Sequence, residues 1–300
     1  QVEVKLLYSP VNSANAERYA EIFGAKAADS PEAIINDPEI DVVCVFVPPF
    51  VRKEYVLAAA KAGKQIVATK PLAADLSDAR EMTEAVEQAG VRCGVIYRRT
   101  NNPVIEAYKE IFSGGEFGKL ALYKQDWLHH YPTWNRWATD PKKNGGPFMD
   151  AMLHNLNAAR YLMGRRVVGR AFFSDDHTHS LACDDTQFLK VDFEQGASAH
   201  LFITWAAELA VYDSAKNDRE HIDQCFMVTD QGWLFRNEIR EGKAVITATR
   251  NGLEKDFPVI PFEETFFDRY AKEIKNRDML PADLPDIREA YEDLRILLEN

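Results

Sequence analysis

Apolar runs and amphipathic segments alternate along the first hundred residues. Four apolar runs predict strands, at 2–8, 41–47, 64–69 and 91–97. Four segments with helical spacing lie between them, at 15–24, 30–36, 51–62 and 76–89. The run 41–47, DVVCVFV, is almost continuously apolar, which is typical of a strand buried on both faces of a parallel sheet. Strands and helices that alternate over short connections indicate a doubly wound parallel sheet with right-handed crossovers.

The pattern changes after about residue 115. A helix is predicted at 102–113, a long alternating strand at 120–131, and a core helix within 145–164. Most of 166–260 alternates apolar and polar residues, which favours a mainly antiparallel or mixed sheet with one exposed face. Two helices are predicted at the end of the chain, at 263–276 and 285–299. We therefore expect a second, α+β domain built on one large open-faced sheet.

Composition narrows the possible functions. The 300 residues include 36 basic and 47 acidic side chains, a net charge of −11 that disfavours sequence-independent binding to nucleic acid or anionic membranes. No apolar run approaches the roughly 20 residues that span a bilayer. Four scattered cysteines without a C-x-x-C predict reduced, buried thiols and a cytoplasmic protein. The chain begins in a strand at Gln1, without an initiator Met; this suggests that the native N-terminus is missing and leaves a periplasmic location open.

Unusual residues follow several predicted strands, at the carboxyl edge where doubly wound sheets bind ligands. The rhythm suggests a dinucleotide-binding fold, although the glycine fingerprint G-x-G-x-x-G is absent. If 2–8 is the second strand of such a fold, the fingerprint would precede Gln1. Tyr8-Ser9 then replaces the usual acidic residue, so NADP is as plausible as NAD, although Ser9-Pro10 can also be read as a simple turn. The residues expected to contact the cofactor are Ser9, Val47, Pro48, Phe50, Lys70 and Arg98.

The predicted core helix carries two polar residues, in GGPFMDAMLHNLNAARYLMG (145–164). Asp150 and His154 are four residues apart and so project from one face of a helix. They are either a buried structural pair or a pair presented to a substrate. The imidazole, whose unperturbed pKa is about 6.5, suits proton transfer near neutral pH.

Four segments together resemble the glucose–fructose oxidoreductase/inositol dehydrogenase (Gfo/Idh/MocA) family: DVVCVFVPP, AAAKAGKQIVATKPLA, YRRTNNP and GGPFMDAMLHNLNAARYLMG. Two positions depart from the family pattern. Thr69 replaces the acidic residue that usually precedes the Lys-Pro pair, and Arg52 stands where a His often follows Thr-Pro-Asn. The lysine and the Asp-x-x-x-His spacing are retained.

The resemblance implies a Rossmann domain over residues 1–100, a substrate and oligomerisation domain over 101–282, and a C-terminal segment, 283–300, that packs back on the first domain. It implies hydride transfer between NAD or NADP and a hydroxyl carbon of a sugar, cyclitol or glycoside, in a homodimer or homotetramer. By resemblance, Lys70, Asp150 and His154 form the reaction centre. We expect His154 to be the acid/base, Lys70 to polarise the substrate oxygen, and Asp150 to hold the hydroxyl or tune Lys70; the roles of His154 and Lys70 could be exchanged.

Other residues are candidates for substrate binding because aromatic faces stack on sugar rings and guanidinium groups bind hydroxyls. They are Arg99, His129, Trp134, Arg136 and Trp137, together with Asp150 and His154. His129 and His130 should point to opposite faces of their strand. DDHTHS (175–180) has metal-binding residue types, but we interpret it as a solvated loop and predict no metal site.

Three alternatives remain open. The protein could retain its cofactor and give net glycoside cleavage, elimination or epimerisation. It could be a metal-dependent sugar hydrolase or isomerase that uses His129 or His130 with Asp150 and His154. It could also be a non-catalytic ligand-binding relative.

Overall fold

The computed structural model describes residues 2–211, 220–275 and 284–299. The chain divides into two compact units, Gln1–Ile96 with Glu264–Leu294, and Tyr97–Glu263 with Arg295–Asn300. This division places the helix near residue 270 with the first unit, whereas we expected it in the second domain. The expected boundary at 282–283 lies outside the described residues.

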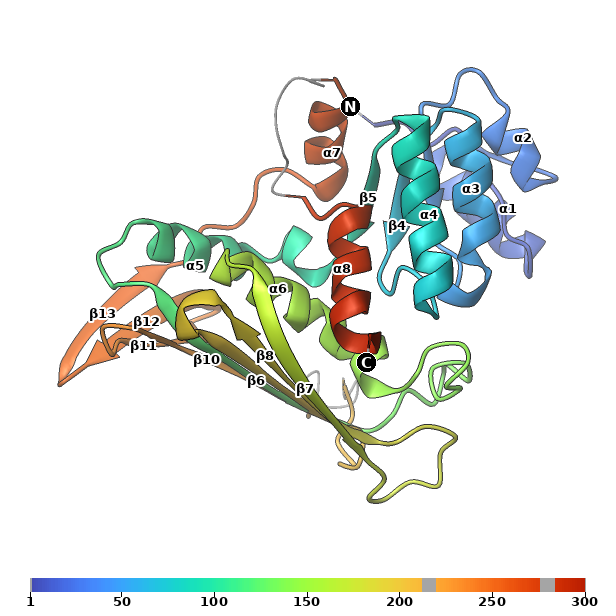
Figure 1. The fold of residues 1–300 in the computed structure, drawn as a ribbon. Coiled ribbons are helices and arrows are strands. Elements are labelled where there is room, and N and C mark those ends of the chain that lie inside the picture. Colours follow the sequence, from blue (N-terminus) through green and yellow to red (C-terminus); the bar gives the residue numbers. More distant parts are fainter. Residues whose placement is uncertain (1, 212–219, 276–283, 300) are drawn as a thin grey trace. The chain divides into compact units, whose positions relative to one another are not determined.

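The first unit is built on short parallel strands. Its strands are β1 (Leu6–Leu7), β2 (Lys26–Ala27), β3 (Val42–Val45), β4 (Gln65–Thr69) and β5 (Cys93–Ile96). Its helices are α1 (Ser13–Phe23), α2 (Pro31–Ile35), α3 (Arg52–Lys61), α4 (Leu76–Ala89), α7 (Phe266–Lys275) and α8 (Ile287–Leu298, up to Leu294) (Figure 1). β1 pairs with β2, and β3, β4 and β5 form a separate sheet in that order; both sheets are parallel. The predicted parallel sheet is confirmed, but the run 2–8 is paired only at β1, and β2 was not predicted.

Strand β3 is less buried than its sequence suggests. Val43 and Val45 are buried, but Cys44 is exposed and Phe46 is 54% exposed, so the expectation of burial on both faces is wrong for this strand. Helix α7 covers the β4 face that carries Val67, and its cluster of buried side chains ends at the half-buried Val42. Beyond Val42, the same face of β3 is open. The expectation of four buried thiols is wrong for the same reason at Cys44, and Cys183 and Cys225 are only partly buried. All four cysteines are free, as expected.

Tyr270 joins α7 to the sheet of this unit. Its hydroxyl donates to the carbonyl of Ile66 at 2.6 Å and accepts the N–H of Gly94 at 3.3 Å. A Cβ at Gly94 would lie 2.8 Å from the ring of Tyr270, so only glycine leaves room for this contact. α8 contacts α4 through a bond from Arg288 Nε to Glu87 Oε1 at 2.6 Å.

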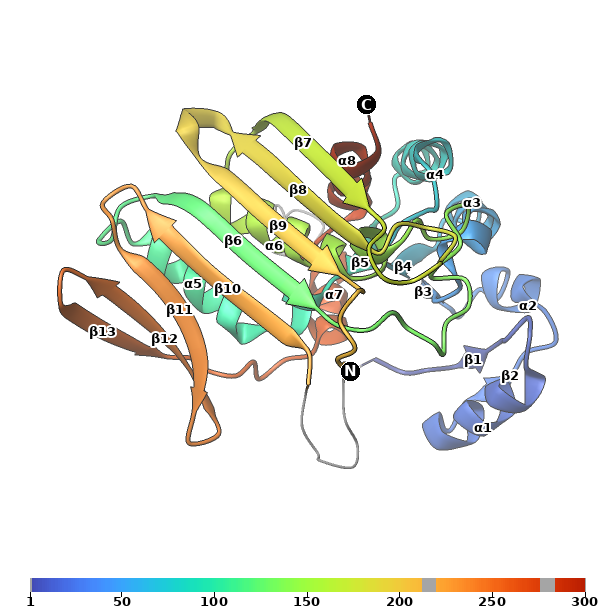
Figure 2. The same cartoon turned by 90° about the horizontal axis from the view of Figure 1, so that it is seen from below.

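The second unit is an eight-stranded sheet with helices on one face. Its strands are β6 (Leu120–Leu128), β7 (Val167–Asp175), β8 (Thr186–Phe193), β9 (Ser198–Thr204), β10 (Ile222–Thr229), β11 (Leu234–Arg240), β12 (Lys243–Arg250) and β13 (Leu253–Pro258). Their order is β13-β12-β11-β10-β6-β9-β8-β7, with β6 and β9 parallel and the other pairs antiparallel. α5 (Pro103–Ser113) and α6 (Leu153–Met163) cover one face, and Figure 2 shows the other face uncovered by helices. The predicted open-faced, mainly antiparallel sheet is confirmed.

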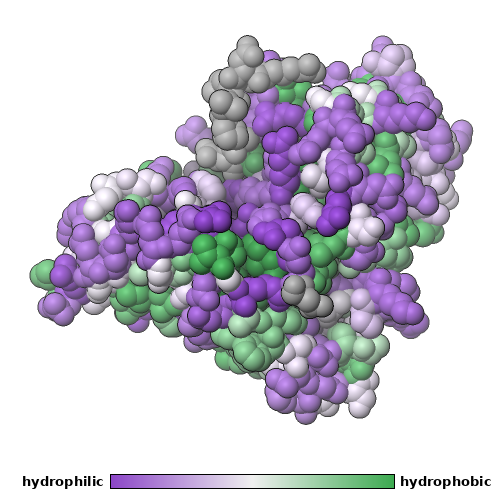
Figure 3. Space-filling view, in the orientation of Figure 1, coloured by the Kyte–Doolittle hydropathy of each residue, from purple (hydrophilic) through white to green (hydrophobic). Residues whose placement is uncertain are grey.

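Hydrophilic side chains cover much of the surface that Figure 3 shows. The outward sides of α3 and α4 are largely hydrophilic (Figure 3). Within the described ranges, no helix combines the length and apolar character needed to cross a bilayer.

We predict that Tyr270→Phe lowers the free energy of unfolding by about 1–3 kcal/mol, because it leaves a buried carbonyl and a buried N–H without their partner. Chemical denaturation measures this change. Tyr291→Phe is the control, since the Tyr291 hydroxyl accepts from Arg80 in an exposed position. Equal effects of the two substitutions would contradict the proposed role of Tyr270.

Candidate functional site

Lys70 lies in a turn that follows β4 directly, and Arg52 holds this turn. Arg52 is the first residue of α3 and is only 2% exposed. Its Nη1 donates to the carbonyls of Thr69 at 2.6 Å and Leu72 at 3.1 Å, and also to that of Pro71. The guanidinium is therefore hydrogen-bonded to backbone carbonyls on both sides of Lys70.

The other arm of the same guanidinium reaches β3. Nη2 donates to the carbonyl of Val47 at 2.7 Å and to Oγ1 of Thr69 at 2.9 Å. Arg52 thus links the carboxyl ends of two neighbouring parallel strands, where ligands of such folds bind. Sequence reasoning noted Arg52 only as a departure from a family pattern, and nothing local in the sequence shows that its partners are carbonyls twenty residues away.

The predicted cofactor contacts of this unit lie at the same edge. Val47 and Pro48 follow β3, Phe50 is half-buried in the next turn, and Lys70 follows β4. Half-buried apolar groups beside a cation fit the nicotinamide end of NAD, whereas the chain contains no glycine fingerprint to hold the pyrophosphate. Ser9 Oγ accepts the N–H of Asn12 at 3.2 Å, as expected for the turn interpretation.

His154 lies in the second unit and is held by the main chain. Its Nδ1 accepts the backbone N–H of Arg98 at 3.1 Å, and the Tyr97 ring meets it edge to face at a centroid distance of 6.1 Å. A ring nitrogen that accepts an N–H carries no proton, so a neutral His154 has its proton on Nε2. The ring therefore offers an N–H donor, and not a lone pair, on its other side.

Asp150 lies in a π-helical turn (Phe148–Met152) that precedes α6. Such turns are rare and often mark functional sites. The glycine pair before it has positive φ, 80° at Gly145 and 99° at Gly146, which glycine adopts without strain. The glycine pair thus allows a tight entry into this helix, whose first turn is π rather than α. Asn144, which is buried, donates Nδ2 to Asp150 Oδ1 at 3.3 Å, a contact that sequence reasoning missed.

Arg98 connects His154 to the neighbouring strands of the sheet. Besides its backbone bond to His154, its guanidinium pairs with Asp223 at 3.0 Å and lies 5.5 Å above the ring of Trp127. These contacts fix the segment that orients the imidazole. Trp127 and Asp223 were not predicted as site residues, because their pairing joins strands a hundred residues apart.

Four buried polar atoms, on His129, on two rings beside it and on the Asn144 that contacts Asp150, have no hydrogen-bond partner within the described part of the chain. They are Trp127 Nε1, His129 Nε2, Asn144 Oδ1 and Trp205 Nε1. His129 uses Nδ1 toward its neighbour's carbonyl at 2.7 Å, which leaves Nε2 as an acceptor. Burial lowers the pKa of His129, in keeping with a neutral ring, while the nearby Asp150 charge opposes this shift. The set thus offers two donors and two acceptors.

The other residues that were predicted to bind substrate fall into two groups. Arg99 is only 2% exposed; its Nε donates to Asn157 Oδ1 at 2.8 Å and its guanidinium lies 4.1 Å above the Tyr161 ring. Partners on α6 therefore hold this side chain, and the predicted role of Arg99 in substrate binding stays a prediction. Trp134 and Arg136 lie on an exposed loop and Trp137 is half-buried there, and their predicted role stays a prediction.

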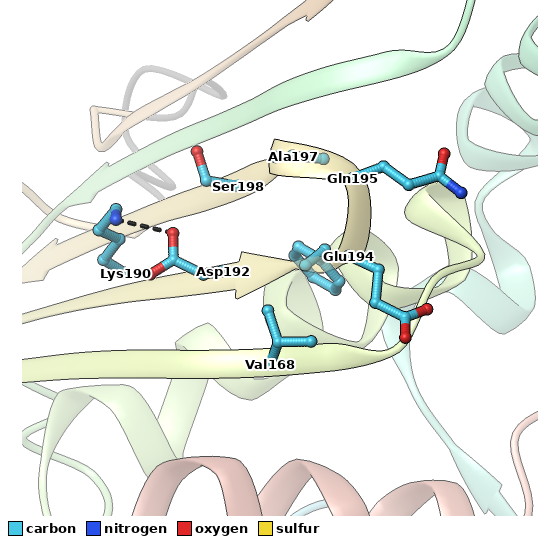
Figure 4. A pocket seen from close by; sticks show the side chains of 9 residues that line it. Val168, Lys190, Asp192, Glu194, Gln195, Ala197 and Ser198 are labelled. Atoms are coloured by element: carbon cyan, nitrogen blue, oxygen red, sulfur yellow. Dashed lines mark ion pairs between the residues drawn. The ribbon is translucent and has the colours of Figure 1, made fainter.

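A surface depression lies at the end of the sheet opposite to His129. It is lined by the β8–β9 turn and by Val168, and it includes the Lys190–Asp192 ion pair at 2.7 Å (Figure 4). His129 lies beside Thr204 at the far end of β9, whereas this depression lies beside Ser198 at its beginning. The depression therefore contains none of the predicted site residues.

Comparisons with known proteins agree on one family. Residues 2–97 match the model of an oxidoreductase family with an NAD-binding Rossmann fold, and residues 105–219 match the GFO/IDH/MocA C-terminal domain. The scyllo-inositol 2-dehydrogenase (NAD(+)) of Bacillus subtilis is 26% identical over 271 residues, covering 87% of this chain and 73% of that protein.

Solved structures share the fold. An aldose-aldose oxidoreductase from Caulobacter crescentus, complexed with glycerol, superposes with a TM-score of 0.80 at 18% identity, over 99% of this chain and 87% of that one. A levoglucosan dehydrogenase in complex with NADH gives a TM-score of 0.78 at 18% identity, over 97% and 85% of the two chains.

We predict that Arg52→Lys lowers the free energy of unfolding by about 2–4 kcal/mol. A lysine ammonium cannot reach acceptors on both sides of the Lys70 turn, so buried carbonyls lose their donor. Denaturant titration measures the loss. Arg80→Lys is the control, because the contact of Arg80 with Tyr291 is exposed. A change no larger than that of the control would show that the turn does not depend on the guanidinium.

We also predict that neutral His154 is the Nε2–H tautomer, since Nδ1 accepts the Arg98 N–H. Long-range ¹H–¹⁵N spectra of ¹⁵N-histidine-labelled protein distinguish the two ring nitrogens, and the spectrum of His154→Gln assigns the signal. A protonated Nδ1 at neutral pH would refute the arrangement.

Proposed function

Because the chain belongs to the Gfo/Idh/MocA family of oxidoreductases, we propose that it transfers a hydride between NAD and a hydroxyl-bearing carbon of a sugar, cyclitol or glycoside. NAD, when bound, supplies the hydride acceptor or donor. Val47, Pro48 and Lys70 would hold its nicotinamide end at the carboxyl edge of β3 and β4.

The unpartnered buried atoms of Trp127, His129, Asn144 and Trp205 are the observation that carries this choice of substrate. Each buried polar atom without a partner costs about 1–3 kcal/mol, so a native fold retains such atoms mainly where a ligand or water completes them. A hydroxyl group both donates and accepts. A polyol is therefore the ligand class that satisfies two N–H donors and two acceptors together.

The tautomer of His154 supports an exchange of the two roles assigned from sequence. Oxidation of an alcohol requires a base for the hydroxyl proton. A ring with Nε2–H cannot accept that proton, but it can donate a hydrogen bond to the substrate oxygen. We therefore assign proton transfer to Lys70 and orientation of the oxygen to His154. Asp150, positioned by Asn144, would accept a neighbouring hydroxyl.

Substitutions distinguish these roles. Lys70→Met should lower kcat by about 10²–10⁴-fold, because general base catalysis is worth that much. His154→Gln keeps an N–H donor near the position of Nε2 and should stay within about tenfold of the original kcat, whereas His154→Leu should lose about 10²–10³-fold. Lys53→Met is the control, since Lys53 pairs with Asp78 at 2.6 Å on the outside of α3.

The assay follows reduced-nicotinamide absorbance over a panel of sugars, cyclitols and glycosides, with NAD and NADP compared. The pH profile of kcat should keep its proton-transfer limb in His154→Gln; loss of that limb would return the base role to His154. No turnover with any panel member would contradict the proposed reaction. Glycoside cleavage without net NADH would instead favour a cofactor-retaining enzyme.

A further inference from the structure

His130, His179 and Glu208 come together from three loops of the second unit. One ligand atom from each lies within 4.8 Å of the others. Glu208 Oε2 is 3.4 Å from His130 Nε2, and its Oε1 is 3.8 Å from His179 Nε2. The two imidazoles meet at a centroid distance of 5.1 Å. None of these residues has a part in the proposed hydride transfer.

The backbone under each of the three side chains is fixed. His130 donates its N–H to the carbonyl of Leu209 at 2.8 Å and bridges to Ala206, which holds the loop of Glu208 over it. The fully buried carboxylate of Asp185 accepts the N–H groups of Thr178 at 2.9 Å and of His179 at 3.1 Å. The sequence interpretation of DDHTHS as a solvated loop is therefore wrong for His179, whose ring is packed against Tyr131.

The hydrogen bond of the His130 ring favours a cation between these groups. Its Nδ1 lies 2.8 Å from the carbonyl of Tyr131 and donates to it, so in the neutral ring Nε2 is bare. That lone pair faces the carboxylate of Glu208. Two lone pairs at this distance repel each other unless a proton or a metal ion lies between them.

The spacing matches a transition metal. Zn²⁺ bonds of about 2.0–2.2 Å in a tetrahedron separate neighbouring ligand atoms by about 3.3–3.6 Å. The distance between His130 Nε2 and Glu208 Oε2 falls in this range. His179 Nε2 now donates to the carbonyl of Trp205 at 3.0 Å, so it would bind the ion after its proton moves to Nδ1 and the ring turns toward Glu208. Hydrogen bonding of the second His130 nitrogen to a carbonyl is the usual outer support of a metal-binding imidazole.

We propose that His130, His179 and Glu208 bind one divalent transition-metal ion of the Zn²⁺ class. The three protein ligands leave one position for water or a ligand oxygen. The ion would tie together the segments that follow β6, β7 and β9. This group differs from the alternative considered from sequence, which combined His129 or His130 with Asp150 and His154.

Metal titration of the full chain, prepared without a histidine tag and treated with a chelator, tests the proposal. Calorimetry with Zn²⁺, and d–d absorbance with Co²⁺, should show one equivalent bound. His130→Ala and Glu208→Gln should weaken binding by more than about tenfold and abolish the rise in Tm that Zn²⁺ causes. Glu208 is 72% exposed in its side chain, so its substitution leaves the fold intact.

His177→Ala is the matched control, because His177 lies in the same loop as His179 with an exposed side chain. It should bind Zn²⁺ and Co²⁺ as the original chain does. The proposal is overturned if neither ion binds saturably, or if His177→Ala weakens binding as much as His130→Ala does. Neither readout depends on dehydrogenase activity, so failure of this proposal and failure of the proposed function are distinguishable.

Discussion

The buried guanidinium of Arg52 is the interaction on which the edge of the first unit depends. It is almost completely removed from water, and it donates to the main chain at the ends of both β3 and β4. A buried charge is tolerated only when its hydrogen bonds are made. Carbonyl dipoles supply them here, so the turn that carries Lys70 cannot relax without exposing a charge to apolar surroundings.

This contact also explains two departures from the family pattern. The sequence has Thr69 where an acidic residue is usual and Arg52 where a histidine is frequent, and the structure joins these two side chains at 2.9 Å. An acidic residue at position 69 would add a charge to a site whose acceptors are already sufficient. The neutral Thr69 hydroxyl accepts one N–H and leaves the others for the carbonyls around Lys70. The two departures are therefore one change in how the turn is held.

The sequence pattern predicted those helices and strands that the local spacing of apolar residues determines. The strand–helix alternation of the first hundred residues, the mainly antiparallel sheet after residue 166 and the positions of Lys70 and His154 on their elements needed no knowledge of distant contacts. The features that it did not predict share a different cause. The partners of Arg99 are Asn157 and Tyr161, and the open face of β3 depends on where α7, more than two hundred residues away, stops covering it. Local periodicity cannot contain such information.

Buried polar groups of this protein fall into two kinds, and the difference separates support from function. Arg52 and Asp185 have several partners each, as buried groups need when they serve the fold. Burial raises the pKa of the Asp185 carboxyl, yet the N–H groups of His179 and Thr178 and the neighbouring bonds bring it below its ordinary value. His129 Nε2 and Trp127 Nε1 are equally shielded but lack partners among the described residues. The fold gives each group of the first kind several bonds and leaves the second kind incomplete, and a bound hydroxyl supplies a reason for the difference.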